Sequence, residues 1–309
     1  LRHSLTLGLK PTQLSALNFM KIDSFNNRHK THDVLRLVFS LMLLTTLLMT
    51  LIGCSEQKVV PTKATIYVFG TLVDITLYHP NTQEAEAAIQ QVEAEFRIFH
   101  KEWHAWEAGG IIGKINQAIG DSKAITVPKS VKDFILKSQT LTRASQQLFD
   151  PGIGKLIGLW GFHKEAWSGP PPPKAVIQNW LAHRPSILDL YFEGFDLYSN
   201  NNQVQLDFGG NAKGLAIDMA LAIIANAGIK SAIVSIGGDM KTLGLKNNQA
   251  WSVGIQNPRN PTQVIAAIQL NAGESIVTSG TYQRYFEWQG QRYSHIINPN
   301  TGYPALGFA

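Results

Sequence analysis

The sequence has little cysteine: Cys54 is the single one among 309 residues. One cysteine cannot form an intramolecular disulfide or build a cysteine-rich zinc site, so disulfide scaffolds and zinc ribbons are excluded. Charged residues make up 16% of the chain, with a net charge of +5, and no basic patch interleaved with aromatics stands out. Nucleic-acid binding is therefore not expected. The composition, 44% hydrophobic with 26 Gly and 14 Pro, is that of an ordinary globular protein.

One long apolar run is present, from Leu37 to Ile52, with basic residues before it. It is as long as the apolar core of a signal peptide and a little short of the roughly 20 residues of a membrane-spanning helix. Leu51-Ile52-Gly53-Cys54 resembles a bacterial lipobox, in which the cysteine is lipidated and becomes the new N-terminus. We expect a lipid anchor on Cys54. The alternative is an uncleaved membrane anchor, and both place the domain outside the cytoplasm, on the periplasmic side.

Three regions follow from this pattern. Residues 1–53 are predicted to be an N-terminal extension and lipoprotein signal peptide, and residues 54–62 a polar tether. The chain opens with Leu1, and Met20 is a plausible true start. Residues 63–309 are predicted to form one domain.

Within that domain the apolar spacing alternates between strand and helix periods. Strand-like alternation begins at Lys63, and Gly70-Thr71 interrupts it, as expected of a bend or a close backbone approach. Helices are predicted over 81–100, 127–145, 174–181 and from the glycine turn at 209–214 to Asn226. Further strands are predicted at 204–208, 232–236, 251–255, 264–270, 275–277, 285–288 and 293–297. This order indicates an α+β fold with a mixed or antiparallel sheet and packed helices.

A glycine-rich turn is the first candidate site. In Leu206-Asp-Phe-Gly-Gly-Asn-Ala-Lys-Gly-Leu-Ala-Ile-Asp218 a predicted strand enters the turn and a helix leaves it. Such a turn lets backbone N–H groups meet an anion at a helix N-terminus, and Lys213 adds charge suited to a diphosphate. The spacing is neither that of a P-loop nor GxGxxG. A plain turn that caps a helix is an equally good reading of these residues alone.

Three other segments give weaker signals. Ser235-Ile-Gly-Gly-Asp239 ends a strand, where the glycines allow either a ligand contact or a simple turn. His295, followed by a Pro/Gly turn, has the form of a base near a substrate hydroxyl, although a lone histidine in a strand is more often structural. The aromatic residues around Trp106 and Trp160 suit stacking on a flat ring, or core packing.

In their joint order these segments, with Phe69-Gly-Thr71, closely resemble the ApbE-type flavin transferases. The most specific matches are Phe149-Asp150 leading to Trp160-Gly161-Phe162, and Tyr293-Ser-His295 leading through Pro299 to Thr-Gly302 and Pro304. They span residues 65–304, nearly the whole predicted domain. The resemblance implies that the chain is a flavin transferase with a T-fold-like single domain.

The resemblance also implies an activity. Members bind FAD and Mg²⁺, cleave the pyrophosphate, release AMP and link FMN by a phosphoester bond to a Thr or Ser hydroxyl of a target flavoprotein. Some members instead hydrolyse FAD to FMN and AMP. A third reading is an FAD-binding lipoprotein without catalysis.

Site residues follow from the resemblance position by position. His295 matches the catalytic histidine, and Gly210 the residue whose carbonyl oxygen binds the metal. The residues expected at the FAD site are Phe69, Trp106, Leu148, Phe149, Asp150, Asp207, Lys213 and Ile297. The sequence departs from the family pattern at Asn211, Thr281 and Asn298. It also ends before the family's Asp-Ala-x-x-Thr segment, whose side chains bind the metal, so we expect the domain to be incomplete at its C-terminus.

Overall fold

The computed structural model describes residues 33–44, 59–164, 166–281 and 284–305. By internal contacts the chain divides into two units, Leu1–Lys58 and Val59–Ala309. In the first unit residues 33–44 are helical and their side chains are exposed. Within the described ranges, helices long and apolar enough to cross a membrane are not found. Cys54 and the lipobox lie outside the described residues, so lipidation remains a prediction.

The second unit is built on a five-stranded antiparallel sheet. Its strands, in spatial order, are β1 (Thr62–Val68), β2 (Thr71–Leu77), β6 (Ala232–Ile236), β7 (Asp239–Leu243) and β10 (Ser275–Ile276). Phe69 and Gly70 join β1 to β2, both with positive φ (59° and 65°), as the two-residue turns of tight hairpins require. The predicted interruption at Gly70-Thr71 is therefore the turn of a hairpin.

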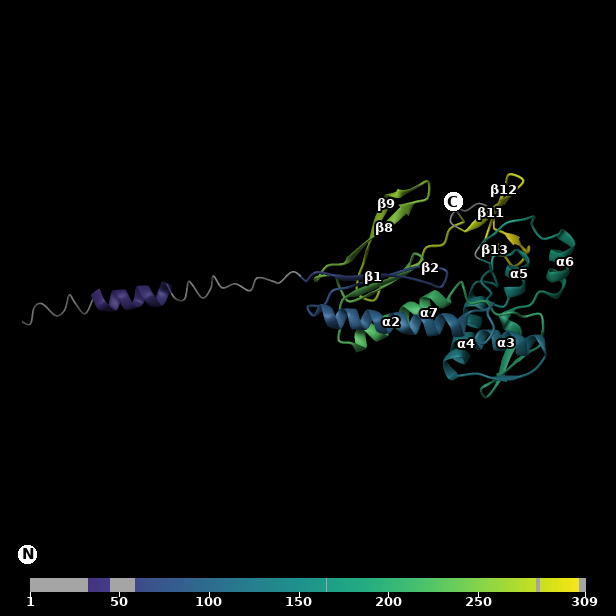
Figure 1. Cartoon of the computed structure of the whole chain (residues 1–309), viewed down its shortest axis with the longest axis horizontal. Coiled ribbons are helices and arrows are strands. Elements are labelled where there is room, and N and C mark those ends of the chain that lie inside the picture. Colours follow the sequence, from purple (N-terminus) through teal and green to yellow (C-terminus); the bar gives the residue numbers. More distant parts are fainter. Residues whose placement is uncertain (1–32, 45–58, 165, 282–283, 306–309) are drawn as a thin grey trace, which may run out of the picture. The chain divides into compact units, whose positions relative to one another are not determined.

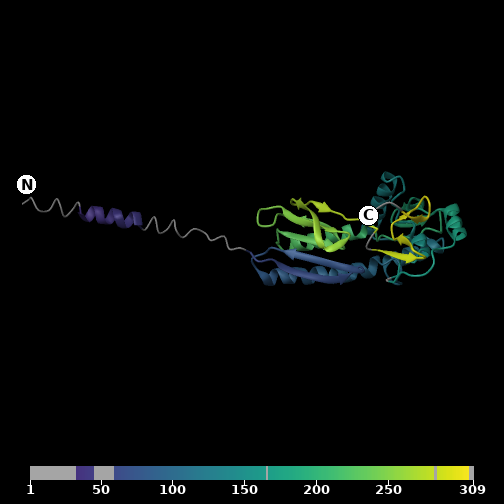
Figure 2. The ribbon, with the colours of Figure 1, turned by 90° about the horizontal axis from the view of Figure 1, so that it is seen from above.

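Two helices cover one face of this sheet, as Figures 1 and 2 show: α2 (Thr82–Trp103) and α7 (Ala212–Asn226). Asn81 starts α2 by accepting hydrogen bonds from the N–H groups of Gln83 and Glu84. The apolar face of α2 packs with α7 and the strands into one core, in which Phe96 and Ile75 are fully buried. This arrangement brings the β1–β2 turn beside the last turns of α2, where Phe69 packs edge-on against Phe96 and Phe99.

A second core lies beyond the end of α2. It is formed by α3 (Ile111–Gly120), α4 (Lys129–Ala144), the short η1 (Ile187–Asp189) and a small sheet of β3 (Ile125–Thr126), β5 (Asp196–Ser199) and β4 (Leu190–Glu193). Trp103, at the end of α2, packs against both this core and the first one. The two cores therefore share apolar contacts where the glycine turn leads into α7.

A third core carries the C-terminal strands. It joins α5 (Gly154–Leu159) and α6 (Lys174–His183) to β11 (Tyr285–Trp288), β12 (Gln291–Ser294), β13 (Ile297–Asn298) and β14 (Tyr303–Pro304). Gln289 and Gly290 form the turn between β11 and β12, with φ of 49° and 78°. A separate hairpin of β8 (Trp251–Asn257) and β9 (Asn260–Leu270) buries Trp251 and Val253 next to the main sheet.

The α+β prediction is confirmed, and every pair of named strands is antiparallel. Two predicted strands are wrong. Residues 204–208 do not form a strand, and their bridge is a single parallel one between Ile153 and Gln205. The predicted strand 293–297 is broken at His295 into β12 and β13, because both the backbone N–H and the ring of His295 turn toward the carbonyl of Arg284.

Candidate active site

The glycine turn leads directly into α7, and the side chain at the N-cap position does not cap the helix. Asn211 occupies the N-cap position, yet its amide donates to Ser138 Oγ of α4 (2.9 Å) and makes no capping hydrogen bond. The N-terminal end of a helix carries partial positive charge and free N–H groups, so an anion is favoured there. A Cβ on Gly210 would lie 3.2 Å from the Phe149 ring, so the glycine allows Phe149 to cover the turn. The turn is therefore shaped to receive an anionic ligand.

Trp106 joins the turn through Asp207. The indole Nε1 donates to Asp207 Oδ2 (2.9 Å), while Asp207 Oδ1 accepts from the N–H of Gly209 (2.9 Å). The Trp106 ring stacks on His163, with centroids 4.4 Å apart and planes at 28°. Burial is the main cause that lowers the pKa of His163 below its ordinary value. A flat ligand on Trp106 would thus meet an indole already held in place on one side by a neutral imidazole.

Lys213 lies in the first turn of α7 and forms an ion pair with Asp239, Nζ to Oδ2, at 2.8 Å. Asp239 begins β7 directly after the Gly237-Gly238 turn, and it is 7% exposed. Gly237 has φ of 57°, and a Cβ there would lie 2.9 Å from Thr71 Oγ1. The turns β1–β2 and β6–β7 therefore meet beside the start of α7, which brings Lys213 to the end of the main sheet.

His295 lies in the break between β12 and β13. Its backbone N–H and its ring Nδ1 are each 3.0 Å from the carbonyl oxygen of Arg284. A carbonyl only accepts, so this contact places the proton on Nδ1 and leaves Nε2 with a lone pair. Burial lowers the pKa of His295, and the positive charges of Arg284 and Lys213 lower it further. The imidazole is thus a neutral base at pH 7, within electrostatic reach of Lys213.

The remaining predicted residues divide into two groups. Phe69 packs on the end of α2 and faces His100 edge-on, and Leu148 is more than half exposed beside Phe149. Asp150 and Ile297, in contrast, are buried. The Asp150 carboxylate accepts from Ser186 Oγ (2.5 Å) and from the N–H groups of Ile187 (2.9 Å) and Gly152 (2.8 Å).

These three hydrogen bonds indicate that Asp150 stabilises the local structure. Burial is the largest influence on its pKa and raises it, although the three hydrogen bonds act in the opposite direction. Ile297 packs with Trp160 in the third core. Contact of either residue with a nucleotide stays a prediction.

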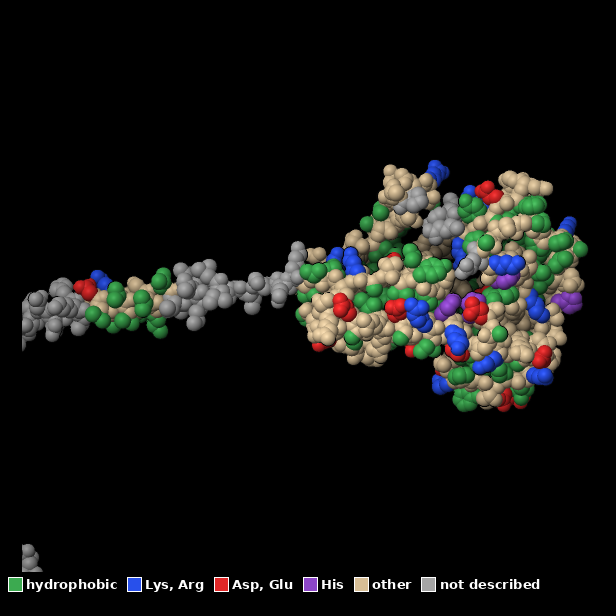
Figure 3. Space-filling model, in the orientation of Figure 1, with side chains coloured by type: hydrophobic (Ala, Val, Ile, Leu, Met, Phe, Trp, Pro, Cys, Tyr) green, Lys and Arg blue, Asp and Glu red, His purple; other side chains and the backbone are tan. Residues whose placement is uncertain are grey.

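Direct contacts thus join Trp106 to Asp207 and Phe149 to Gly210 on the glycine turn, and Lys213 to Asp239 at the end of the main sheet. Figure 3 shows acidic, basic and histidine side chains gathered on the visible face, between the part that carries α2 and the part that carries α3 and α4. Sequence reasoning missed His163, and it noted Asp239 only as the end of a glycine turn. The signal available for Asp239 was its place directly after two glycines.

The described residues do not form a metal centre by themselves, because groups of three or more His, Cys, Asp or Glu side chains placed to bind an ion are not found among them. Both oxygens of Asp207 already accept hydrogen bonds, and Asp239 pairs with Lys213. The predicted ligand that remains is the carbonyl of Gly210. One carbonyl does not fit the near-octahedral oxygen ligation of Mg²⁺.

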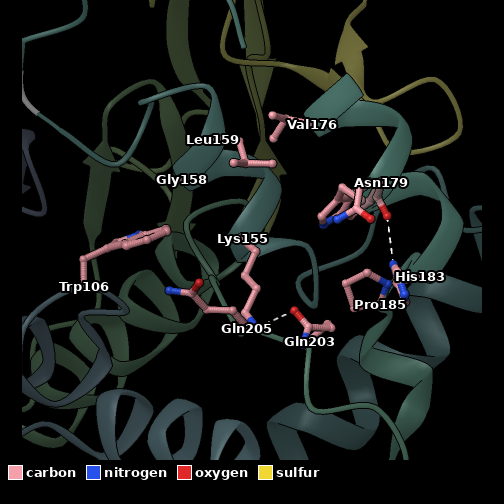
Figure 4. Close-up of a pocket in the computed structure, with 11 residues that line it drawn as sticks. Trp106, Lys155, Gly158, Leu159, Val176, Asn179, His183, Pro185, Gln203 and Gln205 are labelled. Carbon is pink, nitrogen blue, oxygen red and sulfur yellow. Dashed lines mark hydrogen bonds between the residues drawn. The ribbon is translucent and has the colours of Figure 1, made fainter. Parts of the chain in front are cut away.

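A cavity of about 380 Å³ adjoins the site on the far side of Trp106. In Figure 4 Lys155 lies at its centre and reaches toward Gln203, with Trp106 on one side and Asn179 and His183 on the other. Burial lowers the pKa of Lys155. Trp106 is the single residue of the cavity wall that also belongs to the predicted site. The full lining is Trp106, Lys155, Gly158, Leu159, Val176, Asn179, Trp180, His183, Pro185, Gln203 and Gln205.

Comparison with known proteins bears on this geometry. The model of the ApbE family matches residues 69–309. The chain is 37% identical to an FAD:protein FMN transferase of Rhodobacter capsulatus over 79% of its own length and 46% of that protein. It is 33% identical to a protein of the same name from Klebsiella pneumoniae, over 62% of this chain and 58% of the relative. The chain thus spans about half the length of these two relatives.

Solved structures agree on the fold. The crystal structure of the ApbE protein of Thermotoga maritima superposes with a TM-score of 0.71 at 30% identity, covering 80% of this chain and 79% of that one. The apo form of the flavinyl transferase ApbE of Pseudomonas stutzeri superposes with a TM-score of 0.69 at 25% identity, covering 81% and 78%. Both comparisons cover about four fifths of this chain.

Proposed function

This chain belongs to the ApbE family, and on that premise we propose that it transfers FMN from FAD to a Thr or Ser hydroxyl of a target flavoprotein. The relatives that carry the name FAD:protein FMN transferase support the reaction class. The observations that support the proposal for this chain are the Lys213–Asp239 ion pair, which holds a cation at the start of α7, and the effect of the Lys213 charge on the His295 imidazole. On this proposal, Lys213 serves as the cation for the diphosphate and His295 as the neutral base.

The binding roles follow from the contacts. The uncapped start of α7 and the Lys213 ammonium would attract the diphosphate of FAD. The Trp106 ring, fixed by its hydrogen bond to Asp207, would stack on the isoalloxazine. Phe69, at the end of α2, and the exposed Leu148 would offer further apolar surface to the flavin. The dinucleotide is thus held at both its flat and its charged parts.

The transfer step needs a base and a leaving group. His295 Nε2 accepts the proton of the acceptor hydroxyl as its oxygen bonds to the FMN phosphorus, and the bond from that phosphorus to the AMP oxygen breaks. AMP leaves with the electron pair, and the proton passes from His295 to AMP or solvent. Burial holds His295 in the neutral form that this step requires.

Magnesium dependence is part of the proposal and rests on the family resemblance, since the described side chains do not form such a site. The ion would supply charge neutralisation at the diphosphate. The proton transfer and the bond changes at phosphorus are assigned to His295 and the two substrates, not to the ion. Removing divalent ions with EDTA and restoring Mg²⁺ tests this part directly, with AMP release as the readout.

We further propose that Cys54 carries a lipid that anchors the domain to a bacterial membrane on the periplasmic side. The apolar run and the Leu-Ile-Gly-Cys motif support this. Membrane fractions of cells that express the wild type and Cys54→Ala, grown with labelled palmitate, test it. Equal label and equal membrane retention in both would refute lipidation at Cys54.

The activity is tested with purified protein, FAD, Mg²⁺ and a flavoprotein domain that carries a Thr acceptor. We expect AMP release together with a covalent, fluorescent flavin on the acceptor, and neither with His295→Asn. AMP without labelled acceptor would point to FAD hydrolysis, and bound FAD without AMP to a non-catalytic binder. A protein that does not bind FAD at all would refute the proposal.

A further inference from the structure

Asp239 presents a half-satisfied carboxylate inside the site. Its Oδ2 is 2.8 Å from Lys213 Nζ, and the residue is 7% exposed. Its Oδ1 is buried, and within the described part of the chain nothing donates a hydrogen bond to it. A buried polar atom without a partner is costly, so such an atom in a native site needs an explanation.

The charges around Asp239 limit the kind of group that could donate a hydrogen bond to Oδ1. Lys213 already neutralises Asp239, so a second cation would gain little there. An anion would be repelled by the carboxylate. A neutral hydrogen-bond donor is left, and it must reach the start of β7 beside the Gly237-Gly238 turn. Thr278 lies across this turn, its Cβ 3.7 Å from where a Cβ of Gly238 would be.

The place of Asp239 along the bound FAD limits the choice of hydrogen-bond donor further. Lys213 would hold the diphosphate, and His295 would face the phosphorus where the new bond forms. Besides the departing AMP, the groups at that phosphorus are the ribityl chain of the flavin, which carries hydroxyls, and the incoming acceptor hydroxyl. Asp239 lies against Lys213 and is therefore next to both.

We propose that Asp239 binds a substrate hydroxyl through Oδ1 while it positions Lys213 through Oδ2. This inference rests on the proposed function, since it takes the ligand to be FAD and its acceptor. The shared chemistry is a hydroxyl donor, and its two sources are the ribityl chain and the Thr or Ser of the target protein. The residue would thus couple recognition of the sugar chain or acceptor to the placement of the phosphate-binding lysine.

Comparing two ligands distinguishes the role of Asp239 Oδ1 from that of Oδ2. FAD and ADP share the adenosine and the diphosphate, whereas the ribityl chain and the flavin are present in FAD and absent from ADP. Dissociation constants for both are measured by calorimetry on wild type, Asp239→Ala, Lys213→Ala and the double variant. Asp133→Ala, which removes the partner of Lys129 in an exposed ion pair on α4, is the matched control. Circular dichroism melting curves check that each variant is folded.

If Oδ1 binds the ribityl chain, Asp239→Ala weakens FAD about ten- to a hundredfold and ADP clearly less. Lys213→Ala weakens both ligands alike. If Oδ1 binds the acceptor, the losses of Asp239→Ala for FAD and ADP match, but KM for the acceptor rises at saturating FAD. Both results support the proposal.

Equal losses for FAD and ADP with an unchanged acceptor KM, or no loss at all, would overturn it and leave Asp239 as a simple partner of Lys213. Failure of the proposed function gives a different result, because then the wild type itself does not bind FAD. If Asp239→Ala does not fold, Asp239→Ser is used, which keeps a small polar side chain too short to reach the same donor. The same comparison of FAD with ADP then decides the outcome.

Discussion

The sharpest single prediction concerns Trp106. Its indole is fixed by Asp207 at Nε1 and by His163 on one face, and we expect a flat ligand to stack on the opposite face. Replacing Trp106 with Ala removes that platform. Stacking on an aromatic ring contributes about 1–3 kcal/mol, so the dissociation constant of FAD should rise by roughly 5- to 150-fold.

Trp106→Phe separates stacking from the hydrogen bond. The phenyl ring keeps a stacking face, but Asp207 Oδ2 loses its indole donor, which costs about 1 kcal/mol, or roughly fivefold in affinity. Quenching of FAD fluorescence on titration measures both variants. The reasoning predicts the order wild type, Phe, Ala in falling affinity. Affinities of all three within twofold of one another would refute the role of Trp106 as the flavin platform.

Three other predictions follow from the same contacts. Asp150→Ala leaves the N–H donors of Ile187 and Gly152 buried, so urea unfolding should show a loss of about 2–5 kcal/mol, and a loss below 1 kcal/mol would contradict its structural role. Gly237→Val combines a positive φ with a clash against Thr71; it should lower stability by about 1–3 kcal/mol or more, whereas Gly120→Ala, which meets open space, should change stability by less than about 1 kcal/mol. Because burial lowers the pKa of His295, its neutral form persists below the ordinary histidine value of 6.5; AMP release should therefore stay constant as pH falls from 8 to 6.5 and decline only below it, and a decline that begins above pH 7 would contradict this.

Helices α2, α4 and α7 and strands β1, β2 and β6 were predictable because their residues repeat with a clear period, whereas α3, α5 and β7 were not predicted. The apolar spacing of α2, from Ala85 to Phe99, is the same spacing that is buried in the core. The short strands were harder. The hairpin of β4 and β5 was missed because four-residue strands show too little alternation.

The break at His295 depends on a long-range hydrogen bond to Arg284, which local periodicity does not reveal. The same limit applies to the site. The family motifs pointed to Asp207, Lys213 and His295 as separate positions in the sequence. Neither spacing nor propensity could show that Lys213 pairs with Asp239, or that His163 stacks on Trp106, because these contacts join segments brought together only by packing of the three cores.

The most direct measurement is a crystal structure of the protein with FAD bound. The account predicts the diphosphate within hydrogen-bonding distance of Lys213, the isoalloxazine on the free face of Trp106, and His295 Nε2 turned toward the phosphorus of the FMN half. Electron density for FAD in the cavity around Lys155, with the glycine turn and His295 making no contact with the dinucleotide, would contradict it.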